Sequence, residues 1–356
     1  MIKFSIIFFM FLFSYKSYAE ESVKKYFKKV KNKDRVCIIA PAYGSSDQKE
    51  AEEIISNARK IVVKYELTPY FYENILVPGN HSLFSPPDLR FANSDEERYK
   101  QLEHALHNQD CALIWCLRGG YGSVKLLKKL RNLDEPQSIK IFIGFSDITI
   151  LHTFLNKKWG WPTLHFGMPG ALQNVMEKTE TIKDLQQVIF GEVHEVVFRL
   201  TRIGLQDNSL SNINGVSSGG NIVNFARTFG TEFQIDLSNK ILVFEEVGEE
   251  ARWLDGFLEQ LQLIPNFEKI SAIVFGTITP LDKAEIFDQI ISDFQKYVNL
   301  PVFKIVPEDT VGHGGINRVL PLGAQATIYL KGLSKNIKMF VQTGLDPVAI
   351  HSKNEL

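Results

Sequence analysis

Apolar and amphipathic segments alternate along the first half of the chain from residue 36 onward. Two segments with helical periodicity begin at residues suited to capping, Asp47 followed by Glu50 and Ser94 followed by Glu97. Before and between such segments lie short apolar runs of strand length, at 36–40, 67–72, 111–116 and 139–144. Strands that alternate with helices and carry few polar residues indicate a parallel sheet covered on both faces. The pattern therefore predicts an α/β fold.

The second half of the chain has strands and helices of its own. Apolar runs occur at 241–246, 270–276, 301–306, 326–330 and 338–343, and helical segments lie among them at about 221–229, 252–263 and 283–297. The stretch between the halves holds one predicted helix, a β-like run and a polar segment. The 356 residues suffice for about two domains at roughly 150 residues each. We expect an N-terminal domain over 35–170, a connection over 171–212 and a C-terminal domain over 213–348.

Residues 1–19 have the pattern of a secretory signal peptide. Lys3 precedes a mostly apolar run, and Ser17 and Ala19 supply small residues before a cleavage point. The run is shorter than the roughly 20 apolar residues that span a membrane, and no cysteine follows that could carry a lipid anchor. The sequence therefore predicts export to the periplasm with cleavage near Ala19. The alternative is an uncleaved segment or another start site, on a cytoplasmic protein.

Charge is nearly balanced overall but uneven along the chain. The 40 Lys and Arg residues against 41 acids give a net charge of −1, which does not favour binding to nucleic acid. Residues 20–35 hold seven cations and three acids, so a basic leader over 20–34 precedes a body with a net charge of about −7. Contact of this leader with a membrane or wall polymer is one interpretation, and a solvated leader is the simpler one.

The sequence lacks the common motifs of metal and nucleotide sites. It has no HExxH, no GxxxxGK[ST] and no GxGxxG after a predicted strand, and its eight histidines include no pair at i, i+4. Three cysteines are too few for a disulfide framework and form no CxxC pair, so we expect them in the core. We expect neither a metal nor a cofactor.

The segment 141–155, IFIGFSDITILHTFL, is the most informative for chemistry. A buried strand is predicted to end at Gly144 and a helix to begin just after Ser146. A serine at such a turn is held exposed, with the N–H of the next residue and the helix N-terminus facing whatever it binds, as in a nucleophile elbow. The alternative is that Ser146 or Asp147 merely caps the helix.

Other segments could supply the partners that a nucleophilic serine requires, namely a base and an acid that orients it. His313 lies in a glycine-rich loop after the predicted strand 301–306, and Glu245 and Glu246 end the strand 241–246. The turn LRGGYGS at 117–123 contains three glycines whose N–H groups could hold an oxyanion.

Five motifs taken in order carry a resemblance to a known family. They are GGYGS (119–123), GFSDITILH (144–152), SGGNIVNFARTFGT (218–231), ILVFEEVGEE (241–250) and GHGGINRVLPLGAQA (312–326). In this order the chain resembles the LD-carboxypeptidases, a serine peptidase family that includes the microcin C immunity peptidases. The similarity runs from about Arg35 to Val341.

The resemblance implies a fold and a set of catalytic residues. It implies a flavodoxin-like or amidotransferase-like parallel-sheet N-terminal domain and a smaller mixed β/α C-terminal domain. Ser146 matches the nucleophile, Glu245 the acid and His313 the base of a Ser-Glu-His triad. The implied reaction is hydrolysis of the L,D amide bond that releases terminal D-Ala from murein tetrapeptides.

Further residues follow from that mechanism. The N–H groups of Asp147 and of Gly119 or Gly120 would stabilise the oxyanion. Arg118 is a candidate for binding the substrate's terminal carboxylate, with a structural ion pair equally open. Murein peptides are the expected partners, and a homodimer remains open.

The chain departs from the family pattern in three places. Pro41-Ala42 stands where Pro-Ser is usual, His165-Phe166-Gly167 stands where His-Gly-Pro is usual, and EEARWLDG at 249–256 lacks the usual aromatic residue and arginine. These changes put the transfer of substrate-pocket details in doubt, and export is a further departure. Two alternatives therefore stay open, a microcin-immunity-type amidase and a catalytically silent wall-binding protein.

Overall fold

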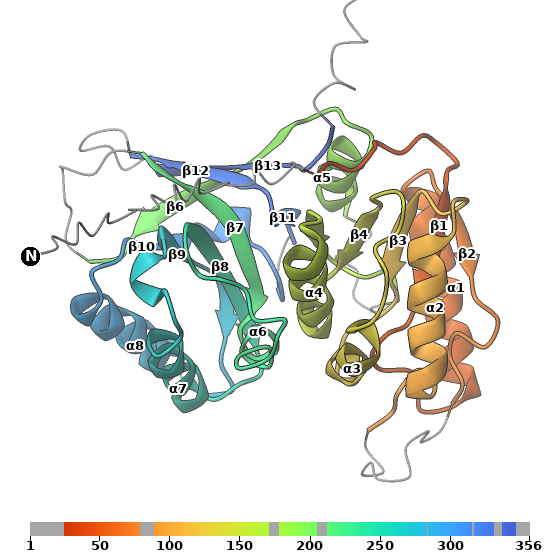
Figure 1. Ribbon diagram of the computed structural model, residues 1–356, viewed down its shortest axis with the longest axis horizontal. Coiled ribbons are helices and arrows are strands. Elements are labelled where there is room, and N and C mark those ends of the chain that lie inside the picture. The colour runs from red at the N-terminus through yellow and green to blue at the C-terminus, as the bar shows by residue number, and fades with distance from the viewer. Residues whose placement is uncertain are drawn as a thin grey trace, which may run out of the picture.

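The protein has two sheets, each with helices packed against it, joined side by side (Figure 1). The structure, a computed structural model, describes residues 25–78, 89–170, 178–204, 212–282, 284–314, 317–330 and 337–346. The predicted signal peptide, residues 1–19, lies outside the described residues. Within the described ranges no helix is both long and apolar enough to cross a membrane.

The first sheet has six strands in the order β11-β5-β4-β3-β1-β2. Neighbouring strands from β2 to β5 are parallel, and β11 pairs with β5 antiparallel. The order 2-1-3-4-5 is that of a flavodoxin-like sheet, so the expected class of the N-terminal domain is confirmed. The strands are β1 (Arg35–Ile39), β2 (Thr68–Phe71), β3 (Leu113–Cys116), β4 (Ile141–Gly144), β5 (Thr163–His165) and β11 (Leu320–Leu322).

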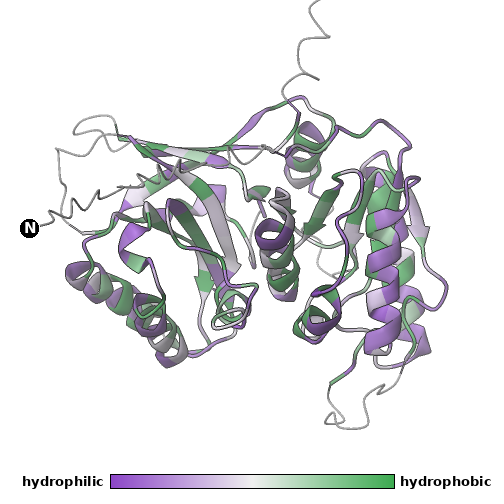
Figure 2. Ribbon diagram, viewed as in Figure 1, coloured by the Kyte–Doolittle hydropathy of each residue, from purple (hydrophilic) through white to green (hydrophobic). Residues whose placement is uncertain are grey.

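Helices cover both faces of this sheet because successive strand residues point to opposite sides. Val36 and Ile38 of β1 pack in one apolar cluster with the buried face of α1, whereas Cys37 and Ile39 pack in a second cluster with α2 and α4. The outward face of α2 is mostly hydrophilic (Figure 2). The helical segments are α1 (Gln48–Lys64), α2 (Asp95–His107), η1 (Ser123–Leu126), α3 (Leu127–Leu130), η2 (Ser146–Ile148) and α4 (Thr149–Trp159).

Both predicted helix caps are present. Asp47 Oδ1 accepts a hydrogen bond from Glu50 N at 2.8 Å, and Ser94 Oγ accepts one from Glu97 N at 3.2 Å. Each bond satisfies a backbone donor that has no partner within the first turn of its helix. These two short-range predictions are confirmed.

The second sheet closes into a barrel in the order β10-β6-β13-β12-β7-β8-β9. Its strands are β6 (Glu195–Arg202), β7 (Ile213–Asn221), β8 (Lys240–Val247), β9 (Ala272–Thr279), β10 (Val302–Ile305), β12 (Gln325–Tyr329) and β13 (Ile337–Gln342). The helical segments of this half are α5 (Thr179–Ile189), α6 (Ile222–Ala226), α7 (Ala251–Gln262), η4 (Phe267–Lys269), α8 (Ala284–Tyr297) and η5 (Pro307–Asp309). A mixed β/α second unit was expected, and its parallel β7-β8-β9-β10 segment with antiparallel neighbours agrees with that expectation.

Two strands lie outside the units assigned to them from sequence. We expected 171–212 to be a connection, but β6 within that range pairs with β10 and β13 and is part of the barrel. We expected 213–348 to form one domain, but β11 within that range pairs with β5 of the first sheet. Both pairings join segments more than 100 residues apart, so no local pattern reveals them.

The described part of the basic leader, residues 25–34, is packed against the body and is not simply solvated as expected. Phe27 is fully buried, and its N–H donates to Gly344 O at 3.0 Å. Val30 is also buried, and its N–H donates to Ile189 O at 2.9 Å. The aromatic ring of Phe27 alone contributes roughly 2 kcal/mol of apolar burial.

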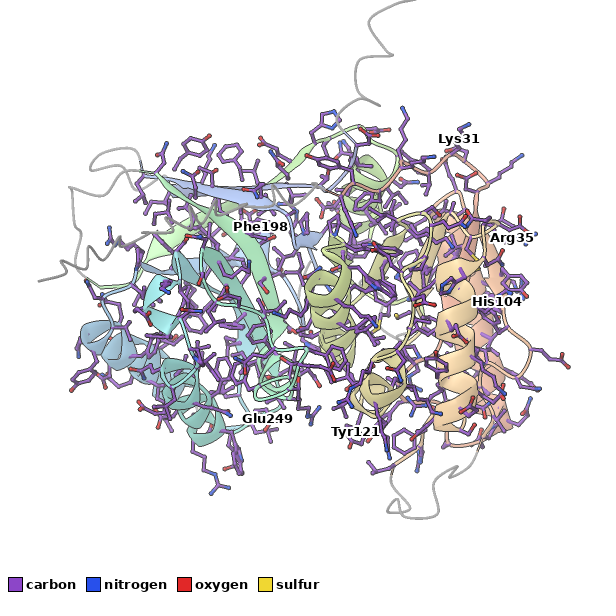
Figure 3. All side chains as sticks on the ribbon, viewed as in Figure 1. Lys31, Arg35, His104, Tyr121, Phe198 and Glu249 are labelled. Atoms are coloured by element: carbon purple, nitrogen blue, oxygen red, sulfur yellow. A yellow bond between two sulfur atoms is a disulfide. The ribbon has the colours of Figure 1, made fainter. Side chains whose placement is uncertain are left out.

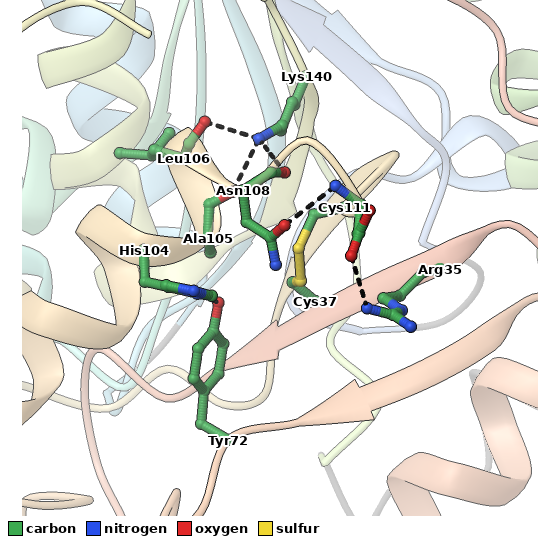
Figure 4. The surroundings of a disulfide bond; sticks show 10 residues. Arg35, Cys37, Tyr72, His104, Ala105, Leu106, Asn108, Cys111 and Lys140 are labelled. Carbon is green, nitrogen blue, oxygen red and sulfur yellow. Dashed lines mark hydrogen bonds and ion pairs between the residues drawn. A yellow bond between two sulfur atoms is a disulfide. The ribbon is translucent and has the colours of Figure 1, made fainter.

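A disulfide joins Cys37 of β1 to Cys111, two residues before β3 (Figure 4). All three cysteines are buried in the core, as expected, and Cys116 is the free thiol among the described residues. The bond between Cys37 and Cys111 was not predicted. β1 and β3 are neighbours in the sheet, and this brings the two Cα atoms to 5.6 Å, within the usual range for a disulfide. Pairing could not be deduced because the two cysteines are 74 residues apart in sequence.

Candidate active site

Ser146 lies on the turn that links β4 to η2 and α4. Its backbone φ is +62°, in the left-handed region that non-glycine residues seldom adopt. Gly119 packs directly against it: a Cβ added there would lie 3.0 Å from Ser146 Oγ. A serine held on a strained strand-to-helix turn matches the nucleophile elbow expected from the sequence.

The glycine turn beside Ser146 is fixed by the residue that follows the serine. Asp147 is fully buried, and its Oδ2 accepts a hydrogen bond from Ser123 N at 2.7 Å. Burial raises the pKa of Asp147, while the bonds from Ser123 and the nearby Arg227 and Arg98 oppose that rise. Asp147 thus orients the turn with its side chain, and its backbone N–H lies in the first turn of a helical segment.

Arg98, which the sequence did not single out, holds two loops of this edge together. Its side chain is fully buried, and Nη1 donates to Pro41 O and, at 3.1 Å, to Gly122 O. Nη2 pairs with Asp95 Oδ1 at 2.5 Å. A buried guanidinium satisfied by carbonyls and one carboxylate gives the glycine turn a fixed position relative to the loop after β1.

His313 and Glu245 are brought together from two elements of the second half of the chain. His313 Nδ1 lies 2.7 Å from Glu245 Oε2, and the His313 N–H donates to the same oxygen at 3.1 Å. The side chain of Glu245 is 1 % exposed and that of His313 is 21 % exposed. The loop leaves no room beside this pair, because a Cβ on Gly312 would lie 2.3 Å from Glu245 Oε2.

The His313 ring reaches across to the turn that carries the serine. Its centroid lies 4.5 Å from that of Phe145, the residue before Ser146. No hydrogen bond joins Ser146 Oγ to His313 among the described residues. Such bonds are commonly long without substrate, and the contact with Phe145 places the His313 ring beside the turn that carries Ser146. Tyr121 and Glu249 both lie at this edge of the molecule, where the two sheets meet (Figure 3).

His165 is the site residue that the sequence analysis missed. It is fully buried at the end of β5, and its Nε2 lies 3.6 Å from Glu245 Oε1. Neither of these two atoms makes a shorter hydrogen bond within the described part of the chain. In the sequence, His165 stood out only as part of an altered motif. Its contact with Glu245 could not be predicted, because it depends on the packing of the two sheets.

These contacts set the ionisation of the pair. Burial of Glu245 opposes its charge, but the adjacent His313 and the donors from His165 and His313 outweigh it and lower the pKa of Glu245. Burial of His313 opposes its protonation, but the charge and hydrogen bond of Glu245 raise its pKa. The arrangement favours a carboxylate that stabilises an imidazolium.

The Glu246 side chain does not contact His313 and instead holds β8 against the start of α6. It accepts hydrogen bonds from Asn221 Nδ2 at 2.7 Å, Val223 N at 3.0 Å and Val247 N at 2.9 Å, which ties β8 to the start of α6. Burial, together with the charge of Glu245, raises its pKa to about 7. The two adjacent acids therefore have different environments, and only Glu245 contacts His313.

Two arginines near the site, Arg118 and Arg227, each have an acidic side chain nearby. Arg118 Nη1 donates to Gly44 O at 2.5 Å and lies 3.4 Å from Glu50 Oε1, so the structural pairing left open by the sequence is present. Arg227 lies over the Tyr121 ring and 3.9 Å from Asp147 Oδ1, with its side chain 36 % exposed. Among the described residues, no group of three or more His, Cys, Asp or Glu side chains is placed to hold a metal ion.

A serine on a strained turn, a histidine and a buried carboxylate are the side chains of a serine hydrolase, here on a flavodoxin-like sheet and a barrel. Comparison with known proteins agrees. The family model of the LD-carboxypeptidase N-terminal domain matches residues 36–166, and that of the C-terminal domain matches 214–328. The chain belongs to the LD-carboxypeptidase family and is a serine-type carboxypeptidase.

Individual relatives show the same relationship. A Rickettsia prowazekii protein named as a carboxypeptidase is 34 % identical over 248 residues, which cover 68 % of this chain and 75 % of that protein. The murein tetrapeptide carboxypeptidase of Pseudomonas aeruginosa is 27 % identical, with 67 % of this chain and 78 % of that protein covered. The crystal structure of the muramoyltetrapeptide carboxypeptidase from Oxalobacter formigenes superposes with a TM-score of 0.68 at 23 % identity, covering 86 % of this chain and 98 % of that one. A microcin C7 self-immunity protein shares the fold, with a TM-score of 0.71 at 16 % identity over 90 % of this chain and 99 % of that one.

Proposed function

We propose that the protein hydrolyses the L,D amide bond that releases terminal D-Ala from murein tetrapeptides, with Ser146 as nucleophile. Ser146 Oγ attacks the amide carbonyl while His313 Nε2 takes its proton. Glu245 holds the opposite ring nitrogen and stabilises the imidazolium that forms. His313 then gives the proton to the departing amine, and water releases the acyl-enzyme by the reverse use of the same groups.

The observation that carries this proposal is the 2.7 Å contact between His313 Nδ1 and Glu245 Oε2 beside the strained turn of Ser146. A bond from Nδ1 leaves Nε2 as the nitrogen that exchanges a proton with the serine. Names of family members that act on murein tetrapeptides support the substrate.

The oxyanion of the tetrahedral intermediate would be held by backbone donors around the serine. The N–H of Asp147 lies at the start of η2, where helix donors have no partner within the helix. Gly119 packs against Ser146. In the described part of the chain, no backbone oxygen accepts a hydrogen bond from the N–H of Gly119 or Gly120. Each such donor is typically worth about 3–4 kcal/mol in the transition state.

We assign the substrate's terminal carboxylate to Arg227 in place of Arg118. Each guanidinium has one hydrogen bond and one acid nearby: Arg118 Nη1 bonds Gly44 O and lies near Glu50. Arg227 Nη1 bonds Asn224 Oδ1 and lies near Asp147. The Arg227 side chain is the more exposed of the two, 36 % against 28 %, and it lies beside the buried acid that follows Ser146. Arg227→Met is expected to raise KM at least tenfold with little change in kcat, and Arg118→Met serves as the matched arginine control. An equal effect of both variants would contradict this assignment.

The catalytic proposal is tested by following free D-Ala released from the disaccharide-tetrapeptide by mass spectrometry. Wild type and Ser138→Ala, a matched change at a serine remote from the site, should release D-Ala, and Ser146→Ala should not. Aspartyl sulfamoyl adenosine, the ligand in a solved immunity-protein structure, provides a second substrate arm. Cleavage of that compound without D-Ala release would favour the immunity-type amidase instead.

We propose, further, that the enzyme is exported and acts in the periplasm. The predicted signal peptide motivates this, and the Cys37–Cys111 disulfide supports it, because disulfides persist in oxidising compartments. A reporter active only outside the cytoplasm, fused to residues 1–25, should become active. Retention of the fusion in the cytoplasm would contradict export and leave the catalytic proposal intact.

A further inference from the structure

A cavity lies between the two sheets, at the far end of α4 from Ser146. Its volume is about 820 Å³. The last turn of α4, residues 156–159, lines one side, and the middle of β7, residues 216–218, lines the other. α4 has 11 residues and therefore extends about 16 Å, which separates this cavity from the turn that carries the serine. Figure 1 shows α4 running between the first sheet and β7.

Positive charge dominates the lining. Four lysines border the cavity against a single acid, Asp236; they are Lys25, Lys157, Lys158 and Lys240. Two of the four are engaged elsewhere: Lys25 pairs with Glu135, and Lys158 Nζ donates to the carbonyl oxygens at 130 and 131. The lining of the cavity is therefore positively charged.

The remaining two lysines lack a direct partner. Within the described ranges, the ammonium group of neither Lys157 nor Lys240 makes a hydrogen bond or ion pair. Burial lowers the pKa of Lys240, the charge of Asp236 opposes that shift, and the charge of Lys157 adds to it. The two ammonium groups thus repel one another across the cavity, and an anion between them would relieve that repulsion.

Neutral polar groups complete the lining. Ser218 is only 4 % exposed and borders the cavity, and no side-chain hydrogen bond of its hydroxyl occurs among the described residues. Gln325 and Gln342 belong to the same lining. A hydroxyl beside the cavity without a protein partner is available to a ligand.

We propose that this cavity binds an oxyanion, a carboxylate or a phosphate, carried on a small polar molecule. Lys157 and Lys240 hold the anionic group as two point charges, and Ser218 and the glutamine amides bind the hydroxyl or carbonyl groups of the remainder. The cavity volume falls within the 300–1,000 Å³ range of sites for small molecules. The proposal does not depend on the reaction assigned to Ser146.

The bound molecule would bridge the two sheets. Lys157 belongs to α4, whose first turn follows the serine, and Lys240 is the first residue of β8, whose far end carries Glu245. Occupancy therefore stabilises the packing of the two elements that carry the catalytic groups, without contact to those groups themselves.

Calorimetric titration of the mature chain at low ionic strength tests the proposal, with inorganic phosphate and D-glucuronate as probes and N-acetylglucosamine as the uncharged reference. One anion should bind at millimolar or better affinity, and the tighter of the two identifies the anionic group. Lys157→Met with Lys240→Met should weaken binding at least tenfold, whereas Lys128→Met, at an exposed lysine of α3, should not.

Two controls keep the outcomes distinct. Ser146→Ala should bind the anion as wild type does, and the double lysine variant should unfold at no lower denaturant concentration, since it removes a repulsion. Absence of binding by both anions, undiminished binding by the lysine variant, or loss of binding in Ser146→Ala would each overturn the proposal. The last result would place the anion in the catalytic site.

Discussion

Replacing His165 by leucine should disturb the active site without touching the proposed triad. His165 Nε2 lies 3.6 Å from Glu245 Oε1, and both side chains are almost entirely buried. A leucine would leave that carboxylate oxygen against apolar atoms. Because the contact requires the tautomer protonated at Nε2, His165→Gln serves as the conservative variant that restores an N–H at a similar reach.

The expected size of the effect follows from the cost of an unpaired buried group. At 3.6 Å the contact is longer than a hydrogen bond, so its loss should cost no more than the roughly 1–3 kcal/mol of an unpaired buried acceptor. The same range corresponds to roughly a 5- to 150-fold loss in kcat/KM if Glu245 turns from His313. The free energy of unfolding should fall by a similar amount, because the buried oxygen of Glu245 lacks its polar neighbour whether or not substrate is bound.

The pH profile separates positioning from simple destabilisation. His313 must be neutral to act as a base, and Glu245 raises its pKa above the ordinary value of a histidine, so kcat/KM should rise with pH through a midpoint above that ordinary value. Removing the donor from Glu245 Oε1 leaves more negative potential at His313 and should move that midpoint to still higher pH. His165→Gln should return the midpoint toward that of wild type.

The measurement is D-Ala release between pH 5 and 9 for wild type, His165→Leu and His165→Gln, with urea unfolding of each. A leucine variant with kcat/KM within twofold of wild type and an unmoved midpoint would refute the reasoning. A glutamine variant as impaired as the leucine variant would show that ring shape, not the N–H, is what matters.

Three further results are expected. Gly312→Ala should lower kcat at least tenfold in a rate assay, because the new Cβ would lie 2.3 Å from Glu245 Oε2. Gly314→Ala is the matched control for backbone strain, because Gly314 also has a positive φ but a Cβ there would lie 3.4 Å from its nearest neighbour. Burial raises the pKa of Glu246 from the ordinary 4.5 to about 7 in the folded protein, so ionisation of Glu246 should remove about 3 kcal/mol of stability as the pH rises between these values. The difference in unfolding free energy between pH 5 and pH 8 should therefore be smaller in Glu246→Gln. Reducing the disulfide, which closes a loop across 74 residues, should lower the unfolding free energy of the first sheet by about 2–4 kcal/mol in denaturant titrations with and without reductant, and no change would contradict its stabilising role.

Local signals in the sequence were sufficient for much of the fold and for the turn that carries Ser146. The caps at Asp47 and Ser94 could be predicted because a capping side chain bonds a backbone group three residues away. The turn at Ser146 could be predicted because an apolar strand and an apolar helix meet there within a few residues. The flavodoxin-like class of the first sheet was implied by the resemblance to a family and not by a local pattern, because the handedness of crossovers does not fix the order of the strands.

What the sequence could not show are contacts between residues far apart in the chain. The approach of His165 to Glu245 joins positions 80 residues apart and depends on the distance between two sheets. The pairing of Cys37 with Cys111 depends on β1 and β3 being neighbours. The engagement of Arg118 by Gly44 O depends on the path of the loop after β1. None of these has a periodicity or spacing that marks it.

The position of β11 changes how the site can admit its substrate. Leu320 of β11 lies seven residues after His313 and pairs with His165 of β5, so the segment that carries His313 is hydrogen-bonded to the sheet that carries Ser146. Rotation of the two halves away from each other would break this strand pairing and the hydrogen bond from Asn221 N to Thr149 Oγ1 at 3.0 Å. A hinge that opens and closes on each turnover is therefore disfavoured. Under the proposed function, the enzyme would then select among murein peptides by the shape of a preassembled opening.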